Sequence, residues 1–295
     1  MLGFTTTRKK GKNMIEIRTC SKGAELVSLK FNGEEKLHDG LNFWNRHSPI
    51  LFPIVGQIKN NKTIIEGKEY SMTQHGFARD MEFKQVKENY YVLEYNEETL
   101  KKFPYKFELH VWYEILDNSL MVNYKVVNKD NKRIMFGLGA HPAFRCNYTN
   151  GKYSIEFEEK EDNIEILQLE NGLISNKKID VENIIKNNKI NLNSESFIND
   201  AIIMKNIKSN KVFLKYEDTE ILNFEFEDFP YLAIWSKVGA NFICIEPWFN
   251  IADKMDSNGI FENKENLIVL EENKEFSCKY KINFKKIVDK NKIYI

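Results

Sequence analysis

The sequence predicts an all-β protein built as one large antiparallel β-sandwich. About eighteen short runs of alternating or apolar residues, rich in β-branched and aromatic side chains, follow one another along the 295-residue chain. Gly, Asn, Asp and Pro residues separate these runs, and only short segments are candidates for helices. No repeat at a fixed period and no flexible linker divides the chain, which favours a single domain over residues 14–295.

The expected strands begin with a hairpin over 15–31, whose two runs flank the turn sequence SKGA. The clearest hairpin joins FELHVWYEIL to SLMVNYKVVN through Asp117 and Asn118, a tight polar turn between two alternating runs. Residues 43–57 contain two prolines and are expected to form a loop that leads into a buried segment. Residues 32–38 are expected to form the turn and return strand of a second hairpin, and residues 62–72 a hairpin with Gly67 near its turn. Further strands are expected at 82–86, 90–95, 134–140, 153–157, 164–169, 201–204, 212–216, 222–226, 232–237 and 276–284. Short helices are expected at 98–102 and near 257–259.

Two regions lack a clear strand pattern. Residues 1–13 are basic, but no apolar stretch follows them, so we expect a flexible N-terminal extension and not a signal peptide. The fold is therefore expected to start near Met14. Residues 171–199 are rich in Asn, Lys and Ile with little periodicity, and are expected to form an irregular excursion on the surface of the same domain.

Composition limits the classes of partner. The 43 basic residues balance the 43 acidic ones, which argues against a nucleic-acid partner that needs a basic surface. No segment has the length of a transmembrane helix, so no membrane partner is expected. The four cysteines form no CxxC pair and are expected to be free thiols in a reducing compartment, which favours a cytoplasmic location.

A glutamate inside an apolar strand is the first candidate for chemistry. In NFICIEPWFNIAD, alternate residues from Phe242 to Trp248 share one face, and Glu246 is the charged residue among them. Pro247 removes a backbone donor, so the ladder of strand hydrogen bonds is expected to end near it. Two interpretations stay open at this point: a buried glutamate in a structural ion pair, or a carboxylate presented to a ligand at a strand end.

Two histidines occupy similar positions at the ends of apolar runs. His75 precedes a glycine in QHGFARD, and His141 in FGLGAHPAF shares a face with Gly137 and Gly139, which leave space for a ligand. Taken alone, each histidine is more typical of a satisfied polar residue, but together with Glu246 they indicate a site. The other histidines, expected to be structural, solvated or on a sheet face, are His38, His47 and His110.

Absent motifs narrow the chemistry further. The chain has no HExxH or Cys–His ligand spacing, so no metal site is expected, and no glycine-rich nucleotide motif, so no cofactor is expected. What remains is a carboxylate and imidazoles with aromatic residues such as Trp44 and Trp248. Aromatic rings suit the apolar face of a sugar, and Glu and His together suit general acid–base catalysis near neutral pH.

In this order along the chain, the motifs resemble those of the aldose 1-epimerase (galactose mutarotase) family in its broad bacterial branch. The most specific are HGFAR (75–79), GAHPAF (139–144) and CIEPW (244–248). Weaker matches are GAELVSL (23–29), SPILFPIVGQ (48–57), FPYKFELHVWY (103–113), LMVNYKVVN (120–128) and NDAIIM (199–204). The resemblance implies a galactose-mutarotase-like β-sandwich (supersandwich) that interconverts the α and β anomers of a free hexose.

The resemblance also implies roles for individual residues. Glu246 would be the general base that takes the proton from the C1 hydroxyl, and His141 the general acid that protonates the ring oxygen. The ring opens, C1 rotates about its bond to C2, and reclosure gives the other anomer. His75 and Asp200 match residues that bind the sugar, and Trp248 is expected beside it.

One position departs from the pattern of the family. An arginine often follows the FPxxG turn, whereas this chain has Gln57. The amide of Gln57 can still hydrogen-bond a sugar hydroxyl but without charge assistance, and Arg79 is the candidate for the missing cation. The preferred sugar is therefore left open.

Three other functions stay open at the level of sequence. A hexose-6-phosphate 1-epimerase would need a cationic clamp, for which the candidates are Arg46, Arg79 and Arg145. A non-catalytic sugar-binding or sensor protein would keep only the pocket. A glycoside hydrolase would need a second carboxylate, from Asp200 or Asp253. In each case the expected partner is a small carbohydrate, a monosaccharide for the favoured epimerase, and the protein is expected to be a monomer or a homodimer.

Overall fold

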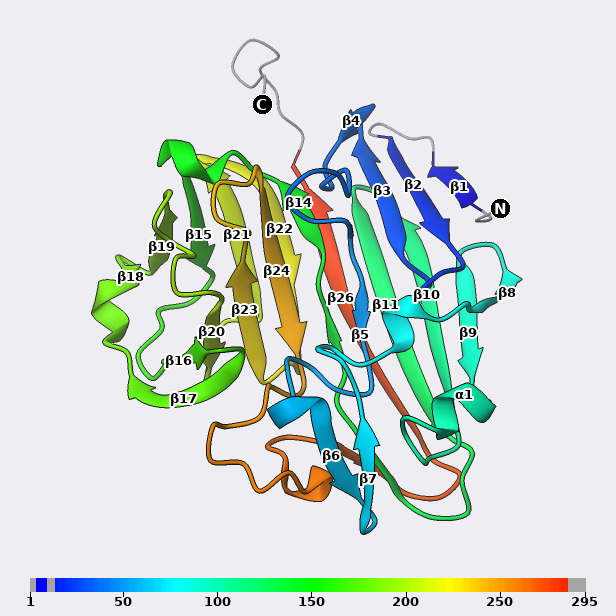
Figure 1. Cartoon of the computed structure of the whole chain (residues 1–295). Helices are drawn as coiled ribbons and strands as arrows, with labels where there is room; N and C mark the ends of the chain where they lie inside the picture. Colours follow the sequence, from blue (N-terminus) through cyan, green and yellow to red (C-terminus); the bar gives the residue numbers. More distant parts are fainter. Residues whose placement is uncertain (1–3, 10–13, 286–295) are drawn as a thin grey trace.

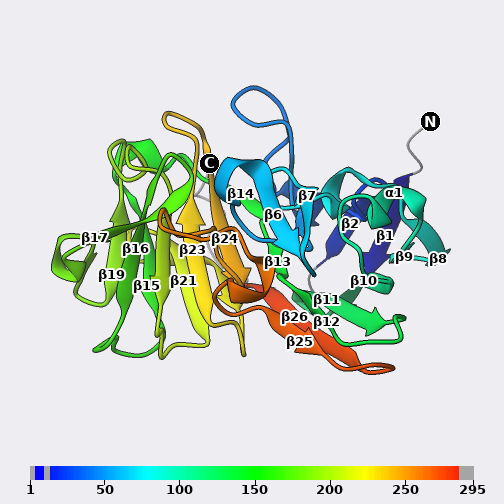
Figure 2. The same ribbon diagram turned by 60° about the horizontal axis from the view of Figure 1, so that its bottom comes forward.

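The structure is a computed structural model that describes residues 4–9 and 14–285. Antiparallel sheets form two layers, which confirms the predicted all-β sandwich. In Figures 1 and 2, the sheet that contains β23 (Tyr231–Trp235) and β24 (Phe242–Trp248) covers one half of the longest sheet. A smaller sheet near the N-terminus covers the other half. Among the described residues, no helix is long and apolar enough to span a membrane.

The longest sheet has ten strands, and each neighbouring pair is antiparallel. The predicted hairpin at Asp117 and Asn118 is present, and pairs Leu116 with Ser119. In sheet order the strands are β18 (Ile185–Lys186), β19 (Lys189–Leu192), β15 (Tyr153–Phe157), β21 (Lys211–Tyr216), β22 (Thr219–Glu225), β26 (Glu275–Phe284), β11 (Ser119–Asn128), β10 (Phe107–Leu116), β9 (Tyr90–Glu94) and β8 (Lys84–Lys87).

The eight-stranded sheet carries the residues of greatest interest. Its strands are β17 (Leu173–Lys178), β16 (Glu165–Glu170), β20 (Ile202–Lys205), β23, β24, β13 (Gly139–Ala140) and β5 (Ile50–Leu51), with β14 (Ala143–Arg145) also paired to β24. β13 and β14 therefore lie along the same neighbour, with a two-residue break between them.

The N-terminal residues differ from the expectation of a flexible extension over 1–13. Phe4–Lys9 form strand β1, paired antiparallel with β2 (Ile15–Cys20) from Phe4↔Cys20 to Lys9↔Ile15. The free edge of β2 offers backbone partners to this polar segment, a tertiary effect that its composition does not reveal. β3 (Leu26–Phe31) and β4 (Glu34–Glu35) complete this four-stranded sheet. Residues 1–3 and 10–13 lie outside the described residues.

The region 171–199 also differs from the expected irregular excursion. It contains β17, β18 and β19, which extend the ends of the two large sheets. Backbone pairing with neighbouring strands imposes this order, although the side chains show little alternation.

The remaining elements are β6 (Lys62–Ile65), β7 (Lys68–Ser71), β12 (Ile134–Phe136), β25 (Ile268–Leu270), helix α1 (Glu97–Leu100) and the 3-10 turns η1 (Lys59–Asn61), η2 (Ala78–Asp80), η3 (Tyr148–Asn150), η4 (Val181–Asn183) and η5 (Phe261–Asn263).

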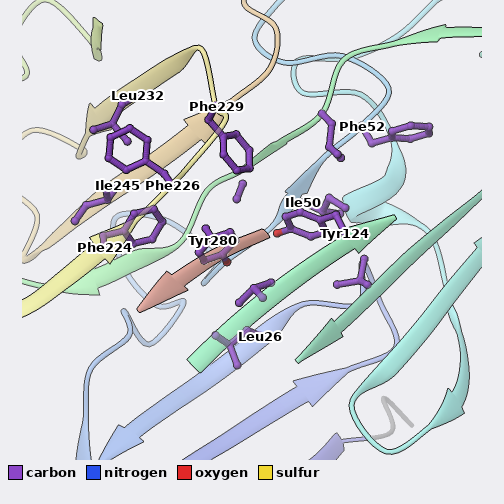
Figure 3. Packing of buried hydrophobic residues seen from close by; sticks show 14 of the residues in the cluster. Leu26, Ile50, Phe52, Tyr124, Phe224, Phe226, Phe229, Leu232, Ile245 and Tyr280 are labelled. Carbon is purple, nitrogen blue, oxygen red and sulfur yellow. The ribbon is translucent and has the colours of Figure 1, made fainter. Parts of the chain in front are cut away.

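The main core lies between the layers. Figure 3 shows Leu26 of β3, Phe224 of β22, Ile245 of β24 and Tyr280 of β26 in one cluster, although they come from opposite ends of the chain. Each is nearly fully buried. Burying a large apolar side chain contributes about 1.5–3 kcal/mol, so contacts between the layers are a main source of stability. The core side of β24 is thereby anchored, which leaves its other side to form a pocket.

Candidate active site

Glu246 projects from the side of β24 that faces away from the main core. Ile243 and Ile245 pack in that core, as the alternation predicts. β24 ends at Trp248, one residue after Pro247, as expected from the proline. The backbone N–H of Ile245 bonds Pro142, and that of residue 249 bonds Leu138. Pro247 lies between these two donors and has no N–H to donate, so the ladder lacks a bond from this position. The register of β24 with β13 and β14 places Glu246 opposite the break between them.

His141 occupies that break and is thereby brought beside Glu246. Its Nε2 lies 3.2 Å from Oε2 of Glu246, and both side chains are buried. Oε2 of Glu246 nevertheless accepts no hydrogen bond. The two atoms are therefore close without being aligned on each other, which leaves both available to a third group in the pocket.

His75 approaches the same point from a tight turn. It has a φ of +66°, and Gly76, at +74°, has no room for a side chain because a Cβ would lie 2.2 Å from the carbonyl oxygen of Phe52. The N–H of Gly56 donates to Nδ1 of His75 at 3.1 Å. An acceptor Nδ1 places the proton of the neutral ring on Nε2, so His75 offers a donor. Its ring lies edge-on to His141, with centroids 5.5 Å apart.

A cavity of about 660 Å³ joins these side chains. Trp44 stacks on His141 with ring centroids 4.7 Å apart, and Trp235 meets the same ring edge-on at 5.6 Å. The predicted site residues on its wall are His75, Arg79, His141, Asp200, Glu246 and Trp248. The structure therefore brings together six of the seven predicted residues. Aromatic faces beside polar groups form the kind of concave site that binds a small polar ligand.

Burial shifts the pKa values of Glu246 and His141 in opposite directions. It raises the pKa of Glu246 well above the ordinary range, and the negative charge of Asp200 raises that pKa further. Burial lowers the pKa of His141 to about 3, and the positive charge of Arg79 contributes to this decrease. The pKa of His75 is also lowered, by burial and then by His141. The pair formed by Glu246 and His141 is therefore expected to hold one proton and no net charge.

Gln57 is the predicted residue that the structure does not place on the pocket wall. It is half-buried, and its Oε1 lies against Gly172, where a Cβ would approach it to 2.2 Å. Gly172 itself lines the cavity. Gln57 therefore contacts Gly172, which is far from it in the sequence, and is not itself a lining residue of the pocket.

Sequence reasoning missed part of the wall. The region 171–199 contributes Gly172, Phe197 and Ile198, and the loop after β23 contributes Lys237. The dipeptide Asn171–Gly172 does indicate a turn, but no local signal indicates that this turn reaches the pocket.

Comparisons with known proteins show which family the chain belongs to. The model of the aldose 1-epimerase family matches residues 7–277. The chain belongs to the aldose 1-epimerase family. Protein LacX (plasmid) of Lactococcus lactis subsp. lactis is 33% identical over 262 residues, which cover 82% of this chain and 87% of LacX.

Solved structures of the aldose 1-epimerase family and related proteins share the fold. A galactose mutarotase related enzyme from Lactobacillus acidophilus superposes with a TM-score of 0.86 at 30% identity, covering 98% of this chain and 100% of that enzyme. A galactose mutarotase-like protein from Lactobacillus casei gives a TM-score of 0.84 at 28% identity, covering 95% and 100%. The predicted family and fold are thereby confirmed.

Three residues just after the CIEPW motif do not line the pocket, namely Phe249, Asn250 and Asp253, although Ala252 between them does. Phe249 packs on Phe229 with ring centroids 4.4 Å apart. Asn250 is fully buried and donates to the carbonyl of Glu265. Asp253 is buried and paired with Lys264 at 2.5 Å. Asp253 is therefore not a second carboxylate facing Glu246.

One group of potential metal ligands occurs in this site, among the described residues. His141, Cys244 and Glu246 each place a ligand atom within 4.8 Å of the others. The sequence does not reveal this group, because its members come from two separate segments.

Proposed function

We propose that this protein is an aldose 1-epimerase that interconverts the α and β anomers of a free hexose. The observation that carries the proposal is the 3.2 Å contact between His141 Nε2 and Glu246 Oε2. The hydroxyl and ring oxygens of the sugar are bonded to the same carbon, C1. A base and an acid that act on these two oxygens must therefore be neighbours.

In the proposed mechanism, Glu246 removes the proton from the C1 hydroxyl while His141 protonates the ring oxygen. The bond between C1 and the ring oxygen breaks, and C1 becomes an aldehyde. Rotation about the C1–C2 bond presents the other face, and the reverse transfers close the ring. The reactive arrangement needs ionised Glu246 and protonated His141, which together hold the same number of protons as the neutral pair.

The other residues position the sugar. Nε2–H of His75 is a donor for a sugar oxygen, and Asp200 is an acceptor for hydroxyls. Trp44, Trp235 and Trp248 supply apolar faces around the ring. The test is polarimetry of freshly dissolved α-glucose and α-galactose with catalytic amounts of protein. A rate that does not exceed spontaneous mutarotation for any aldose tested would contradict the proposal.

The expected dependence of activity on pH follows from the single proton that Glu246 and His141 share. A second proton creates a buried positive charge, so the acid limb of kcat/KM is expected well below the ordinary His value of 6.5. Loss of the last proton creates a buried negative charge, so the alkaline limb is expected well above the ordinary Glu value of 4.5. Activity is therefore present between these limits and lost outside them. A profile of kcat/KM against pH measures both limbs, and an acid limb at 6.5 or above would contradict this assignment.

A second candidate, a hexose-6-phosphate 1-epimerase, is supported by two arginines on the pocket wall. Arg46 donates to Asp80 at 2.9 Å, whereas Nε of Arg79 is buried without a hydrogen-bond partner. Arg145, the third candidate for a phosphate clamp, does not line the pocket and donates to the carbonyl of Leu37.

If the substrate is phosphorylated, Arg46→Gln is expected to lower kcat/KM for glucose 6-phosphate roughly 10–100-fold, because a charge-assisted hydrogen bond contributes about 1.5–3 kcal/mol. The rate with free glucose should change little. Arg145→Gln is the matched control and should leave both substrates unaffected. Equal rates for glucose 6-phosphate in wild type and in Arg46→Gln would argue against this substrate.

A further inference from the structure

We propose that His141, Cys244 and Glu246 form a binding site for a thiophilic divalent cation, with Zn²⁺ as the representative ion. Occupation of this site would reversibly inhibit the enzyme, because the cation takes the lone pairs of the proposed base and acid. The inhibition rests on the proposed function, whereas the binding site does not.

The geometry is close to that of a three-ligand zinc site. One potential ligand atom of each residue lies within 4.8 Å of the other two, and the contact between His141 and Glu246 is 3.2 Å. Tetrahedral zinc bonds of 2.0–2.3 Å place ligand atoms roughly 3.5 Å from one another, so small side-chain movements complete the site. Cys244 and Glu246 are two residues apart on β24, so their side chains lie on the same face of this strand. The strand therefore holds both metal ligands on a rigid element.

A second observation supports the cation site: its potential ligand residues are buried, and some of their polar atoms have no hydrogen-bond partner. The exposed fractions are 0% for Cys244, 1% for Glu246 and 5% for His141. Oε2 of Glu246 and Nδ1 of His141 have no hydrogen-bond partner, and Cys244 is a free thiol. Buried polar atoms are usually satisfied, and a cation would satisfy the carboxylate oxygen of this group.

The ligand set selects the kind of ion. Thiolate, imidazole and carboxylate are the ligands of Zn²⁺, whereas Mg²⁺ prefers oxygen ligands alone. His141 and Glu246 line the cavity, so the fourth coordination position faces the pocket and would hold water. Cys244 lies behind them, packed with Trp44 and Trp235. Binding releases the thiol proton and the one proton of the pair to solvent, and no oxidation is involved.

The test uses the full chain and Cd²⁺, whose bond to a thiolate gives a charge-transfer absorption in the ultraviolet. Wild type is expected to show this band with one equivalent of Cd²⁺, and Zn²⁺ should compete for it while Mg²⁺ does not. Cys244→Ser should lose the band and bind Zn²⁺ at least 10-fold more weakly. Cys146→Ser is the matched control, since Cys146 is equally buried but outside this group, and it should keep the band.

Glu246→Gln provides a second variant if Cys244→Ser does not fold. It should keep the thiolate band but bind Cd²⁺ at least 10-fold more weakly. A missing band in wild type, or a band that persists in Cys244→Ser, would overturn the site. The anomerisation rate is measured in parallel, and EDTA should restore the rate that Zn²⁺ suppresses. A band that depends on Cys244, in a protein without epimerase activity, would support the site and reject the proposed function.

Discussion

We expect Glu246→Gln and His141→Asn each to lower the rate of anomer interconversion by roughly 10²–10⁴-fold, the usual contribution of a general acid or base. Glutamine keeps the shape of the side chain but cannot take a proton from the C1 hydroxyl. Asparagine keeps a polar group in the break between β13 and β14 but cannot protonate the ring oxygen. Polarimetry of freshly dissolved α-anomer gives the rate, and circular dichroism shows whether each variant is folded.

His110→Asn is the matched control for the histidine. His110 lies on β10 in the other sheet, where Nδ1 contacts the hydroxyl of Tyr90 at 3.0 Å. It does not line the pocket, so its replacement should leave the rate within a factor of about two, as for substitutions away from the chemistry. Wild-type rates in folded Glu246→Gln or His141→Asn would reject the assignment of base and acid.

The second large effect is on stability and concerns the ion pair of Asp253 and Lys264. Their side chains are 3% and 4% exposed, and Nζ of Lys264 also donates to the carbonyl of Ile251. Oδ2 of Asp253 accepts the backbone N–H of Lys59. Lys264→Met would leave a buried carboxylate without its counter-ion, and should lower the free energy of unfolding by about 3–5 kcal/mol. Urea denaturation measures this change.

Two further variants distinguish the two possible causes of the lost stability in Lys264→Met, the unpaired buried charge and the lost packing. Asp253→Asn added to Lys264→Met removes the unpaired charge, so the double variant should be more stable than Lys264→Met alone. Lys62→Met breaks an exposed ion pair with Glu69, whose side chains are 55% and 59% exposed, and should cost less than about 1 kcal/mol. A similar loss in Lys62→Met and Lys264→Met would show that burial of the pair is not the cause.

Local sequence patterns were sufficient to predict most of the strands. The hairpin at Asp117 and the alternation in β24 follow from side-chain periodicity and turn residues, which act within a few residues. The same rules failed for β1, where the free edge of β2 decides the structure, and for β17 to β19, where neighbouring strands do.

Taken by itself, the sequence determined the all-β class, the candidates Glu246, His141 and His75, and the resemblance to a family. These depend on residue types and their local order. The tertiary structure alone decided that His141 meets Glu246 at 3.2 Å, that Gln57 lies against Gly172, and that Cys244 lies close to His141 and Glu246. The physical reason is that distances between separate strands depend on sheet register and on breaks in the ladder, which no local pattern encodes.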